Sequence, residues 1–480
     1  MTRLATVLRR HKLPRRDRLW LGVESTFAVS TGPAEMPTVE SVRAVIRELA
    51  TIDPGNRFVR RVDADRGVRP RVRSSRRERF LSALVTGFDD GPAAVGEPDR
   101  DPGPLLGRLG EICEEGLGDL PVRILVGRRC SIFVFSHLTG DYSCLTFWTG
   151  VLRHALAGSR PTDLVESGTR YPLPRAVADT YGRRPALLTG LAASMRARRE
   201  VPVPAVRMRF LGDDRPGLDE PALVEAAAGL PPIAFGVDGA AGGADSAAGV
   251  GRLAQRSKPG YLAMLREWRD AHVPGVSVNS VLFAATLAAS DLVGLPRDDD
   301  GVHLPCDLRR YLRDDAPRFG NFVERLTMWP DDPTSPASLG AQLRRATEVG
   351  QPLARHVVQI AKTWRPRSRS LDAAPPSAPD TRPWLVSWGR VPGLEGLRWL
   401  APADGRYFVN ARSGGAGEGI SFVYVELAGT LHVRAQFDER RYDTALVRQA
   451  LDLLCTDPIG VLDSHSGGRT DPARTAPPRA

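Results

Sequence analysis

Short apolar runs alternate with stretches of helical periodicity along the chain, and this mixture predicts an α/β protein. Residues 123–126 and 130–135 are rich in β-branched and aromatic side chains, and the turn that begins at Gly127 between them is typical of a hairpin. Further on, large apolar residues recur at helical spacing: Leu145, Trp148, Leu152 and Leu156. Gly158 suits a helix C-terminus, so we predict two strands followed by a helix that begins near Ser143.

The same two periodicities predict elements throughout the rest of the chain. Helical spacing occurs at residues 40–49, 261–272, 280–293, 339–349 and 443–455, and residues 427–437 alternate as in a strand. Asn279 stands immediately before one of these helices, and we interpret it first as the helix N-cap.

Proline- and glycine-rich stretches divide the chain. Prolines between residues 160 and 205 interrupt regular structure and predict a link between two domains. Residues 236–251 and 365–383 are expected to be long loops, the first because it is rich in Gly and Ala and the second because of its prolines. We therefore predict a first lobe over residues 1–175, a second over 200–460, and a disordered polar tail over 461–480.

Composition excludes several classes of protein. The 480 residues are 42% hydrophobic and 25% charged, an ordinary profile for a soluble chain that is long enough for two domains. No apolar run reaches the roughly 18 residues of a membrane span, and the arginine-rich start lacks a signal core, so we expect a cytoplasmic protein. The five cysteines have no C-x-x-C spacing, which predicts reduced, mostly buried thiols and no metal site.

The net charge of +10 comes almost entirely from arginine. No nucleic-acid-binding motif accompanies it, so we expect no nucleic-acid partner. Residues 57–79 hold ten arginines against three acidic residues, and such a cluster would attract an acidic carrier protein or the phosphates of coenzyme A. A simple solvated basic face is an equal alternative.

His137 and Asp141 form the most informative short pattern in the chain. They lie four residues apart, between the second predicted strand and the helix that follows it. An imidazole near a helix N-terminus is favoured in its neutral form, which a general base requires. The other His-x-x-x-Asp match, His303 to Asp307, reads as a strand that ends in a loop. The alternative for His137 is a structural histidine at a strand end.

Several segments resemble the chloramphenicol acetyltransferase-like superfamily, and most closely its stand-alone nonribosomal peptide condensation domains. Ser136 to Tyr142 resembles the H-H-x-x-x-D-G signature. Four later segments follow in the order found in the family: 276–285 resembles T-V-N-D-V-L-L-A-A, 304–309 P-V-D-L-R, 319–323 G-N-F-V, and 386–390 S-N-x-G. The resemblance covers roughly residues 120–450, and it implies two chloramphenicol-acetyltransferase-like lobes in a V-shaped pseudo-dimer with the site in the cleft between them.

The resemblance also implies roles for individual residues. His137 is expected to be the catalytic base, and Asp141 is expected to pair with Arg309, which would fix the loop. A surface position is the alternative for Arg309. The residues expected to line the reaction channel are Ser136, Tyr142, Asn279, Ser387 and Trp388. Cys144 could be imagined as a nucleophile, but nothing beside it in the sequence would lower its pKa.

This chain departs from the signature at two positions of the loop. Ser136 replaces the first histidine, which the family tolerates, and Tyr142 replaces the glycine. Tyr142 could narrow the site, alter the choice of acceptor or abolish catalysis.

Two functions are therefore compatible with the sequence. The first is a stand-alone acyltransferase that moves an acyl group from a phosphopantetheine thioester, on a carrier protein or coenzyme A, to a small amine or alcohol in specialised metabolism. It would hold no tightly bound cofactor. The second is an inactive protein of the same fold that binds carrier proteins in a biosynthetic complex.

Overall fold

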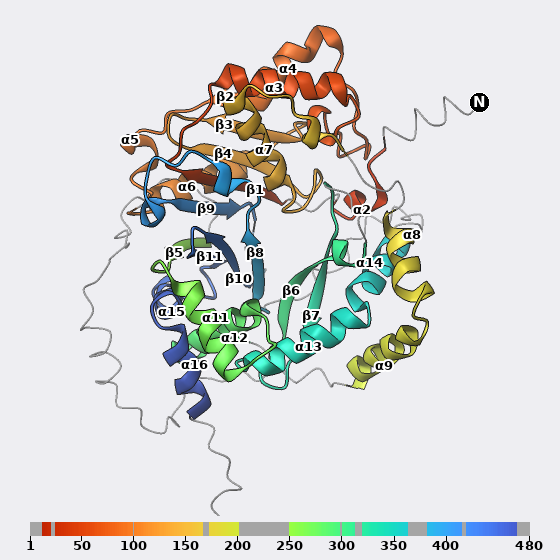
Figure 1. The fold of residues 1–480 in the computed structure, drawn as a ribbon, viewed down its shortest axis with the longest axis vertical. Helices are drawn as coiled ribbons and strands as arrows, with labels where there is room; N and C mark the ends of the chain where they lie inside the picture. The colour runs from red at the N-terminus through yellow and green to blue at the C-terminus, as the bar shows by residue number, and fades with distance from the viewer. Residues whose placement is uncertain are drawn as a thin grey trace, which may run out of the picture.

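Two β-sheets covered by helices form two lobes (Figure 1). The computed structural model describes residues 12–20, 25–98, 100–166, 172–200, 249–297, 300–312, 319–362, 382–414 and 419–467. The α/β class and the two-lobed architecture predicted from the sequence are confirmed.

The first lobe contains a five-stranded sheet with the order β2-β3-β4-β1-β9. β2 runs parallel to β3, and the other neighbours are antiparallel. Its strands are β1 (Thr26–Gly32), β2 (Val85–Gly87), β3 (Val122–Val126), β4 (Ser131–Ser136) and β9 (Tyr407–Arg412). Its helices are α2 (Arg15–Arg18), α3 (Val39–Ile52), α4 (Arg77–Leu84), α5 (Pro92–Val95), α6 (Gly103–Glu115) and α7 (Cys144–Ala157).

Strand β4 is apolar on both faces because helices cover the sheet on both sides. Ile132 and Val134 face the α6 side, whereas Phe133 and Phe135 pack with residues of α3 and α7. Trp148 of α7 is fully buried against Phe133, and its indole nitrogen donates to Ser131 Oγ at 3.1 Å. Burial of an aromatic side chain of this size contributes about 3 kcal/mol, so α7 holds the end of β4 firmly in place.

The second lobe contains a six-stranded mixed sheet with the order β5-β11-β10-β8-β6-β7. Its strands are β5 (Val250–Arg256), β6 (Val302–Asp307), β7 (Val323–Met328), β8 (Trp384–Arg390), β10 (Ile420–Leu427) and β11 (Thr430–Asp438). Its helices are α11 (Tyr261–His272), α12 (Val278–Leu292), α13 (Pro336–Glu348), α14 (Gln351–Lys362), α15 (Thr444–Thr456) and α16 (Pro458–Gly467).

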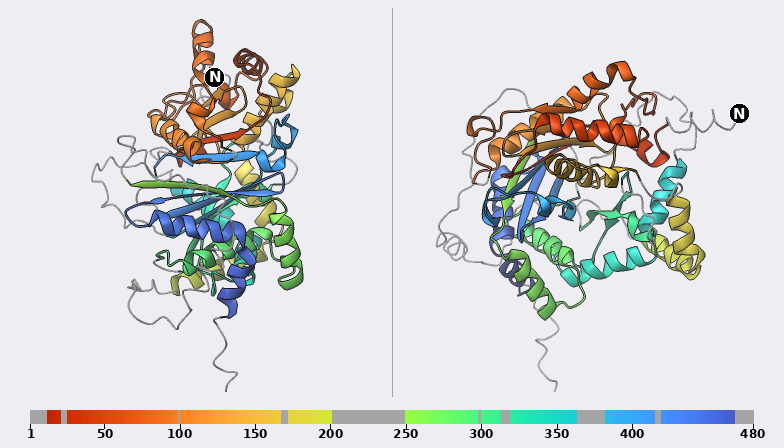
Figure 2. Two further views of the ribbon diagram at one scale, coloured as in Figure 1. Left: turned by 90° about the vertical axis from the view of Figure 1, so that its left-hand side faces the viewer. Right: turned by 45° about the horizontal axis from the view of Figure 1, so that its top comes forward.

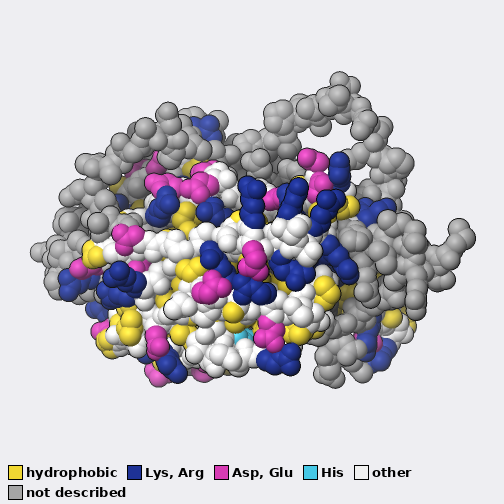
Figure 3. Space-filling model, turned by 90° about the horizontal axis from the view of Figure 1, so that it is seen from above, with side chains coloured by type: hydrophobic (Ala, Val, Ile, Leu, Met, Phe, Trp, Pro, Cys, Tyr) yellow, Lys and Arg dark blue, Asp and Glu magenta, His cyan; other side chains and the backbone are white. Residues whose placement is uncertain are grey.

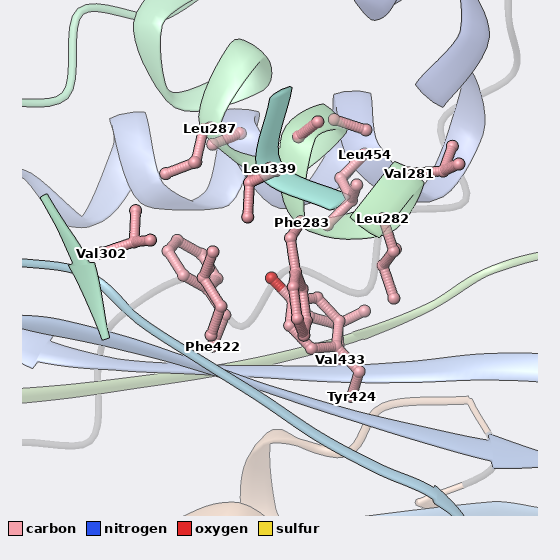
Figure 4. Close-up of a cluster of buried hydrophobic side chains, with 14 of the residues drawn as sticks. Val281, Leu282, Phe283, Leu287, Val302, Leu339, Phe422, Tyr424, Val433 and Leu454 are labelled. Atoms are coloured by element: carbon pink, nitrogen blue, oxygen red, sulfur yellow. The ribbon is translucent and has the colours of Figure 1, made fainter. Parts of the chain in front are cut away.

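Helix α12 is the centre of the second lobe and is buried along most of its length. Phe283 packs on Tyr424 of β10 with ring centroids 5.5 Å apart (Figure 4). The Tyr424 hydroxyl donates to Thr286 Oγ1 at 2.8 Å, so the one polar atom of this buried ring has a partner.

The segment between the lobes is more helical than its prolines predict. It contains α8 (Pro172–Val177), a π-helical turn (Ala178–Gly182) and α9 (Ala186–Glu200). The two prolines of α8, Pro172 and Pro174, lie in its first turn, where a missing N–H costs nothing. Helix α8 contacts α14 of the second lobe (Figure 1).

Strand β9 connects the lobes. It comes from the range predicted for the second lobe, yet it pairs with β1 and completes the first sheet. It also contacts β10 and β11, and α6 contacts β5, so the two sheets lie against each other (Figure 2). Hydrophobic periodicity gives no information on strand partners, so the sequence could not reveal this exchange.

Most predicted elements are confirmed within a few residues, including the β3–β4 hairpin, α7 and the C-cap at Gly158, whose φ is 60°. The N-cap prediction for Asn279 is wrong, because the extended Ser277 accepts from Ser280 N and caps α12. The disordered tail is predicted to begin at residue 461. This prediction is wrong for residues 461–467, which continue α16 and include the buried Val461 and Leu462.

The expected loop at 365–383 lies almost wholly outside the described residues, as does that at 236–251 up to residue 248. All five cysteines are free and buried, as predicted. Within the described ranges, no helix has the length and apolar character needed to span a bilayer.

Candidate active site

The loop from Ser136 to Ser143 joins β4 to α7 and carries the histidine motif at the point where the two lobes meet. The amides of Thr139 and Gly140 both donate to the Ser136 carbonyl, at 2.9 and 3.2 Å, and close a tight turn directly after the strand. A Cβ atom on Gly140 would lie 2.8 Å from Cys144 Sγ, so glycine at this position lets the turn pack against the start of α7.

The His137 ring lies between two aromatic side chains. Trp20 stacks on it with ring centroids 3.8 Å apart, and Phe27 of β1 meets it edge-on at 5.1 Å. Nδ1 is buried without a hydrogen-bond partner among the described residues, while the residue as a whole keeps intermediate exposure. Burial lowers the pKa of His137 to about 4, although Asp141 acts in the opposite direction. The imidazole is therefore neutral at physiological pH.

Asp141 points to the second lobe. It is 1% exposed, and its two carboxylate oxygens lie 2.9 and 3.2 Å from the Arg309 guanidinium, in the short helix after β6. The amides of Ser143 and Phe322 donate to it at 3.0 and 2.9 Å. Burial would raise the pKa of Asp141, but Arg309 and these hydrogen bonds hold it below its ordinary value. The carboxylate is thus a fixed anion that joins the loop to the second lobe.

The segment Gly320-Asn321-Phe322, which precedes β7, docks directly on this loop. The Gly320 carbonyl accepts from Arg309 at 2.9 Å. The Asn321 amide group donates to the His137 carbonyl. With the bond from the Phe322 amide to Asp141, three consecutive residues of the second lobe hold the histidine loop of the first.

Three buried groups that the sequence did not single out complete the support of the loop. Asp17, on α2, is 0% exposed and lies 3.5 Å from Arg57 and 3.1 Å from Arg69. Arg57 and Arg69 donate to carbonyls of the histidine loop. In the sequence, Asp17 is one charged residue in an arginine-rich stretch, and the two arginines belong to a cluster that resembled a surface patch, so composition gave no signal for their burial.

Tyr142, which stands in place of the motif glycine, reaches across to the second lobe. Its hydroxyl donates to Asp307 Oδ2 at 2.8 Å, and Asp307 in turn lies 3.2 Å from Arg309. Burial and the neighbouring Asp307 carboxylate raise the pKa of Tyr142 above its usual range, so the phenol stays protonated. The tyrosine therefore joins the same ionic group as Asp141 and leaves the Asp141–Arg309 pair intact. Ser136, the last residue of β4, has intermediate exposure.

The other predicted channel residues cluster on β8 and α12. Ser387 Oγ donates to Asn279 Oδ1 at 3.1 Å, so these two candidates are neighbours. Trp388 lies 6.4 Å from Phe27, the ring that touches His137. Trp20, His137, Phe27 and Trp388 thus form a continuous aromatic series from the segment after α2 to β8, of which the sequence named only His137 and Trp388 as candidates.

Two cavities among the described residues are lined by other groups and do not include His137. One is lined by Ala254, Tyr407 and His432 among others, and the second by Arg390, Trp399 and Arg406 among others. The part of the chain that the structure describes contains no group of His, Cys, Asp and Glu side chains able to hold a metal ion.

No family model matches this sequence, and no curated protein matches it. Solved structures do match over almost the whole chain. The starter condensation domain of rhizomide synthetase RzmA, solved with C8-CoA, has 12% identity and a TM-score of 0.55 over 98% of this chain and 99% of that one. The TRI3 trichothecene 15-O-acetyltransferase from Fusarium sporotrichioides has 12% identity and a TM-score of 0.54 over 92% and 94%.

The epimerization domain from the third module of tyrocidine synthetase B is also similar, with 14% identity and a TM-score of 0.52 over 92% of each chain. At these identities the likeness establishes the fold. The chain therefore has the two-lobed fold of the condensation and chloramphenicol acetyltransferase-like enzymes, as the sequence resemblance predicted.

Proposed function

We propose that the protein is a condensation-type acyltransferase that moves an acyl group from a thioester to an amine or hydroxyl in specialised metabolism, with His137 as its general base. The observation that carries the proposal is a neutral imidazole, held on a rigid loop where two lobes of this fold meet. The fold supports a transferase in general, because its structural neighbours include an acetyltransferase and a condensation domain.

The loop geometry fits proton abstraction rather than nucleophilic catalysis. Burial raises the pKa of the Cys144 thiol above its usual range, so this residue supplies no thiolate. Asp141 is committed to Arg309 and cannot act as the third member of a serine triad. The neutral His137 ring is the group of the motif that is free to accept a proton.

The reaction would follow from that assignment. His137 takes the proton from the acceptor nitrogen or oxygen as that atom attacks the thioester carbonyl. The tetrahedral intermediate then collapses, the carbon–sulfur bond breaks, and the imidazolium returns the proton to the departing thiolate. General base catalysis of this kind contributes about 10² to 10⁴-fold to the rate. A thioester is already activated, so no covalent enzyme intermediate is required.

The donor is proposed to be coenzyme A or the phosphopantetheine arm of an acyl or peptidyl carrier protein. Support comes from the basic face around η2 (Ser74–Arg76) and α4, where Arg71, Arg73, Arg76 and Arg79 are exposed. Figure 3, which views the molecule from above, shows Lys and Arg side chains interspersed with Asp and Glu on that side of the molecule. An acidic carrier surface or the phosphates of coenzyme A would be attracted there. The protein is proposed to act in the cytoplasm, where coenzyme A and carrier proteins are both present.

The test is a turnover assay with two classes of donor. Purified protein is incubated with octanoyl-CoA or with an octanoyl-loaded carrier protein and a panel of small amines and alcohols, and products are detected by mass. The His137→Ala variant is expected to lose about 10² to 10⁴-fold in rate and to keep the circular dichroism spectrum of the wild type.

His154→Ala provides the matched control. His154 is also buried in the first lobe, but it lies outside the histidine loop and forms hydrogen bonds with Ser159 and Asp163. Product formation that His137→Ala leaves unchanged would refute the proposal. An inert wild type that binds the loaded carrier protein would favour the inactive, carrier-binding alternative.

A further inference from the structure

A single buried carboxylate contacts every side chain that holds the three carbonyls after β4. The carbonyls of His137, Leu138 and Thr139 accept, in order, from Asn321, Arg69 and Arg57. The contacts from Arg69 and Arg57 measure 2.5 and 2.9 Å. A buried carbonyl left without a donor would cost about 1 to 3 kcal/mol.

Asp17 is the common partner of these three donors. Asn321 donates to its Oδ1 at 3.0 Å, and its Oδ2 lies 3.1 Å from Arg69 and 3.5 Å from Arg57. Arg57 and Arg69 come from one arginine-rich segment of the first lobe, whereas Asn321 lies 304 residues after Asp17, in the second lobe. Asp17, on α2, therefore links arginines of the first lobe to Asn321 of the second lobe at one point beside the histidine loop.

Charge explains why a carboxylate is needed there. Arg16, Arg57 and Arg69 all face Asp17, and the last two are 4% and 6% exposed. Burying guanidinium groups together is unfavourable unless anions compensate them. Glu166 pairs with Arg57 at 3.0 Å on the outer side, and Asp17 provides the charge on the side of the loop.

Packing around this cluster is close. Gly320 has a φ of 118°, and a Cβ atom there would lie 2.9 Å from Arg16 and 3.1 Å from Arg57. Glycine thus allows the second lobe to approach the arginines closely enough for Asn321 to reach both Asp17 and the His137 carbonyl.

We infer that Asp17 is the positioning residue of the acyl-transfer site: it orders Asn321, Arg69 and Arg57 so that they fix the backbone of residues 137–139 and hence the direction of the His137 ring. This inference rests on the proposed function. It differs from the role of the Asp141–Arg309 pair, which holds the far end of the same loop. Trp20, two residues after α2, stacks on the ring, so residues 17–20 contact both the donors of the loop backbone and one face of the imidazole.

Asp17→Asn is the variant of choice, because it keeps the shape and one acceptor for Asn321 but removes the charge that orders the arginines. Hydrogen exchange of the peptide 137–143, read by mass spectrometry, measures the loop without any substrate. We expect exchange of the Thr139 and Gly140 amides to accelerate at least tenfold. With octanoyl-CoA and the best acceptor from the panel, kcat should fall about tenfold and KM for octanoyl-CoA should change less than twofold.

Val45→Ala is the control, since it loosens the core of the same lobe at a position on α3 and leaves every hydrogen-bond donor of the loop in place. It should leave loop exchange and kcat within twofold of the wild type. The inference is overturned if folded Asp17→Asn exchanges its loop like the wild type, or if its exchange rises evenly over the lobe.

Should Asp17→Asn fail to fold, Asn321→Ala and Arg69→Lys decide, because each changes one of the donors that join Asp17 to the loop and leaves Asp17 in place. Unchanged loop exchange in both would equally overturn the inference. An inactive wild type with a loop that loosens in Asp17→Asn would refute the proposed function alone, so the two failures are distinguishable.

Discussion

Replacing Arg309 by alanine should destabilise the protein in a way that depends on pH. The substitution removes the counter-ion from Asp141, a carboxylate that is 1% exposed. Loss of one partner from a buried pair costs about 3 to 5 kcal/mol. The amides of Ser143 and Phe322 still donate to the carboxylate, and the Arg309 side chain is itself 15% exposed, so we expect a loss of about 3 kcal/mol at pH 8.

The sign of the pH effect follows from the pKa of Asp141. In the wild type this pKa lies below its ordinary value, so the group is ionised in both the folded and unfolded states from pH 5 to 8 and adds no slope there. Without Arg309, burial remains and raises the folded pKa above the ordinary value. The folded variant then binds more protons than the unfolded chain as the pH falls, so its deficit at pH 5 should be smaller than at pH 8.

Guanidinium denaturation followed by tryptophan fluorescence measures both quantities. Arg310→Ala is the control, because Arg310 is the exposed neighbour of Arg309 in the same short helix and its loss should cost less than about 0.5 kcal/mol. The double variant Asp141→Asn with Arg309→Ala should regain part of the stability, since it removes the unpaired charge. A deficit that is equal at pH 5 and pH 8, with no recovery in the double variant, would refute the reasoning.

Four further predictions concern the histidine loop. The plot of kcat/KM against pH should have an acid limb near pH 4 and none near 6.5. The reason is that His137 becomes protonated, and stops accepting protons, only when the pH falls through its lowered pKa. A limb near 6.5 would contradict the lowered pKa of the buried ring. Trp20→Ala should move that limb toward 6.5, since it uncovers one face of the imidazole, whereas Trp268→Ala on α11 should not. Tyr142→Phe loses one hydrogen bond to a carboxylate and should cost about 1.5 kcal/mol in denaturation. Tyr142→Gly removes the whole ring and should change the preference among acceptors in the turnover assay.

Local pattern was sufficient to predict the frame of the site. The β3–β4 hairpin and α7 depend on residues within about 35 positions of one another, where periodicity and turn chemistry act directly. The Asn279 error has the same local origin, since Ser277 has an equally good capping side chain and lies two residues earlier.

What the sequence could not reveal is the set of long-range contacts. Asp17 and Asn321 are separated by 304 residues, and nothing in the arginine-rich start suggests a buried carboxylate. The arginines of residues 57–79 separate into buried members that serve the loop and exposed members on the outer face, and composition treats both alike. Burial of a charged residue is decided by its partners, and those are known only once the chain has folded.

The placement of β9 limits how the protein can be divided or recombined. A chimera joined within residues 176–249 would give its amino-terminal half a sheet whose outer strand, β1, had to find a new neighbour. Unsatisfied strand edges of that kind promote aggregation. A workable exchange between homologues would therefore transfer residues 398–412, which include β9, together with the amino-terminal lobe. The two segments are far apart in the gene but belong to one sheet.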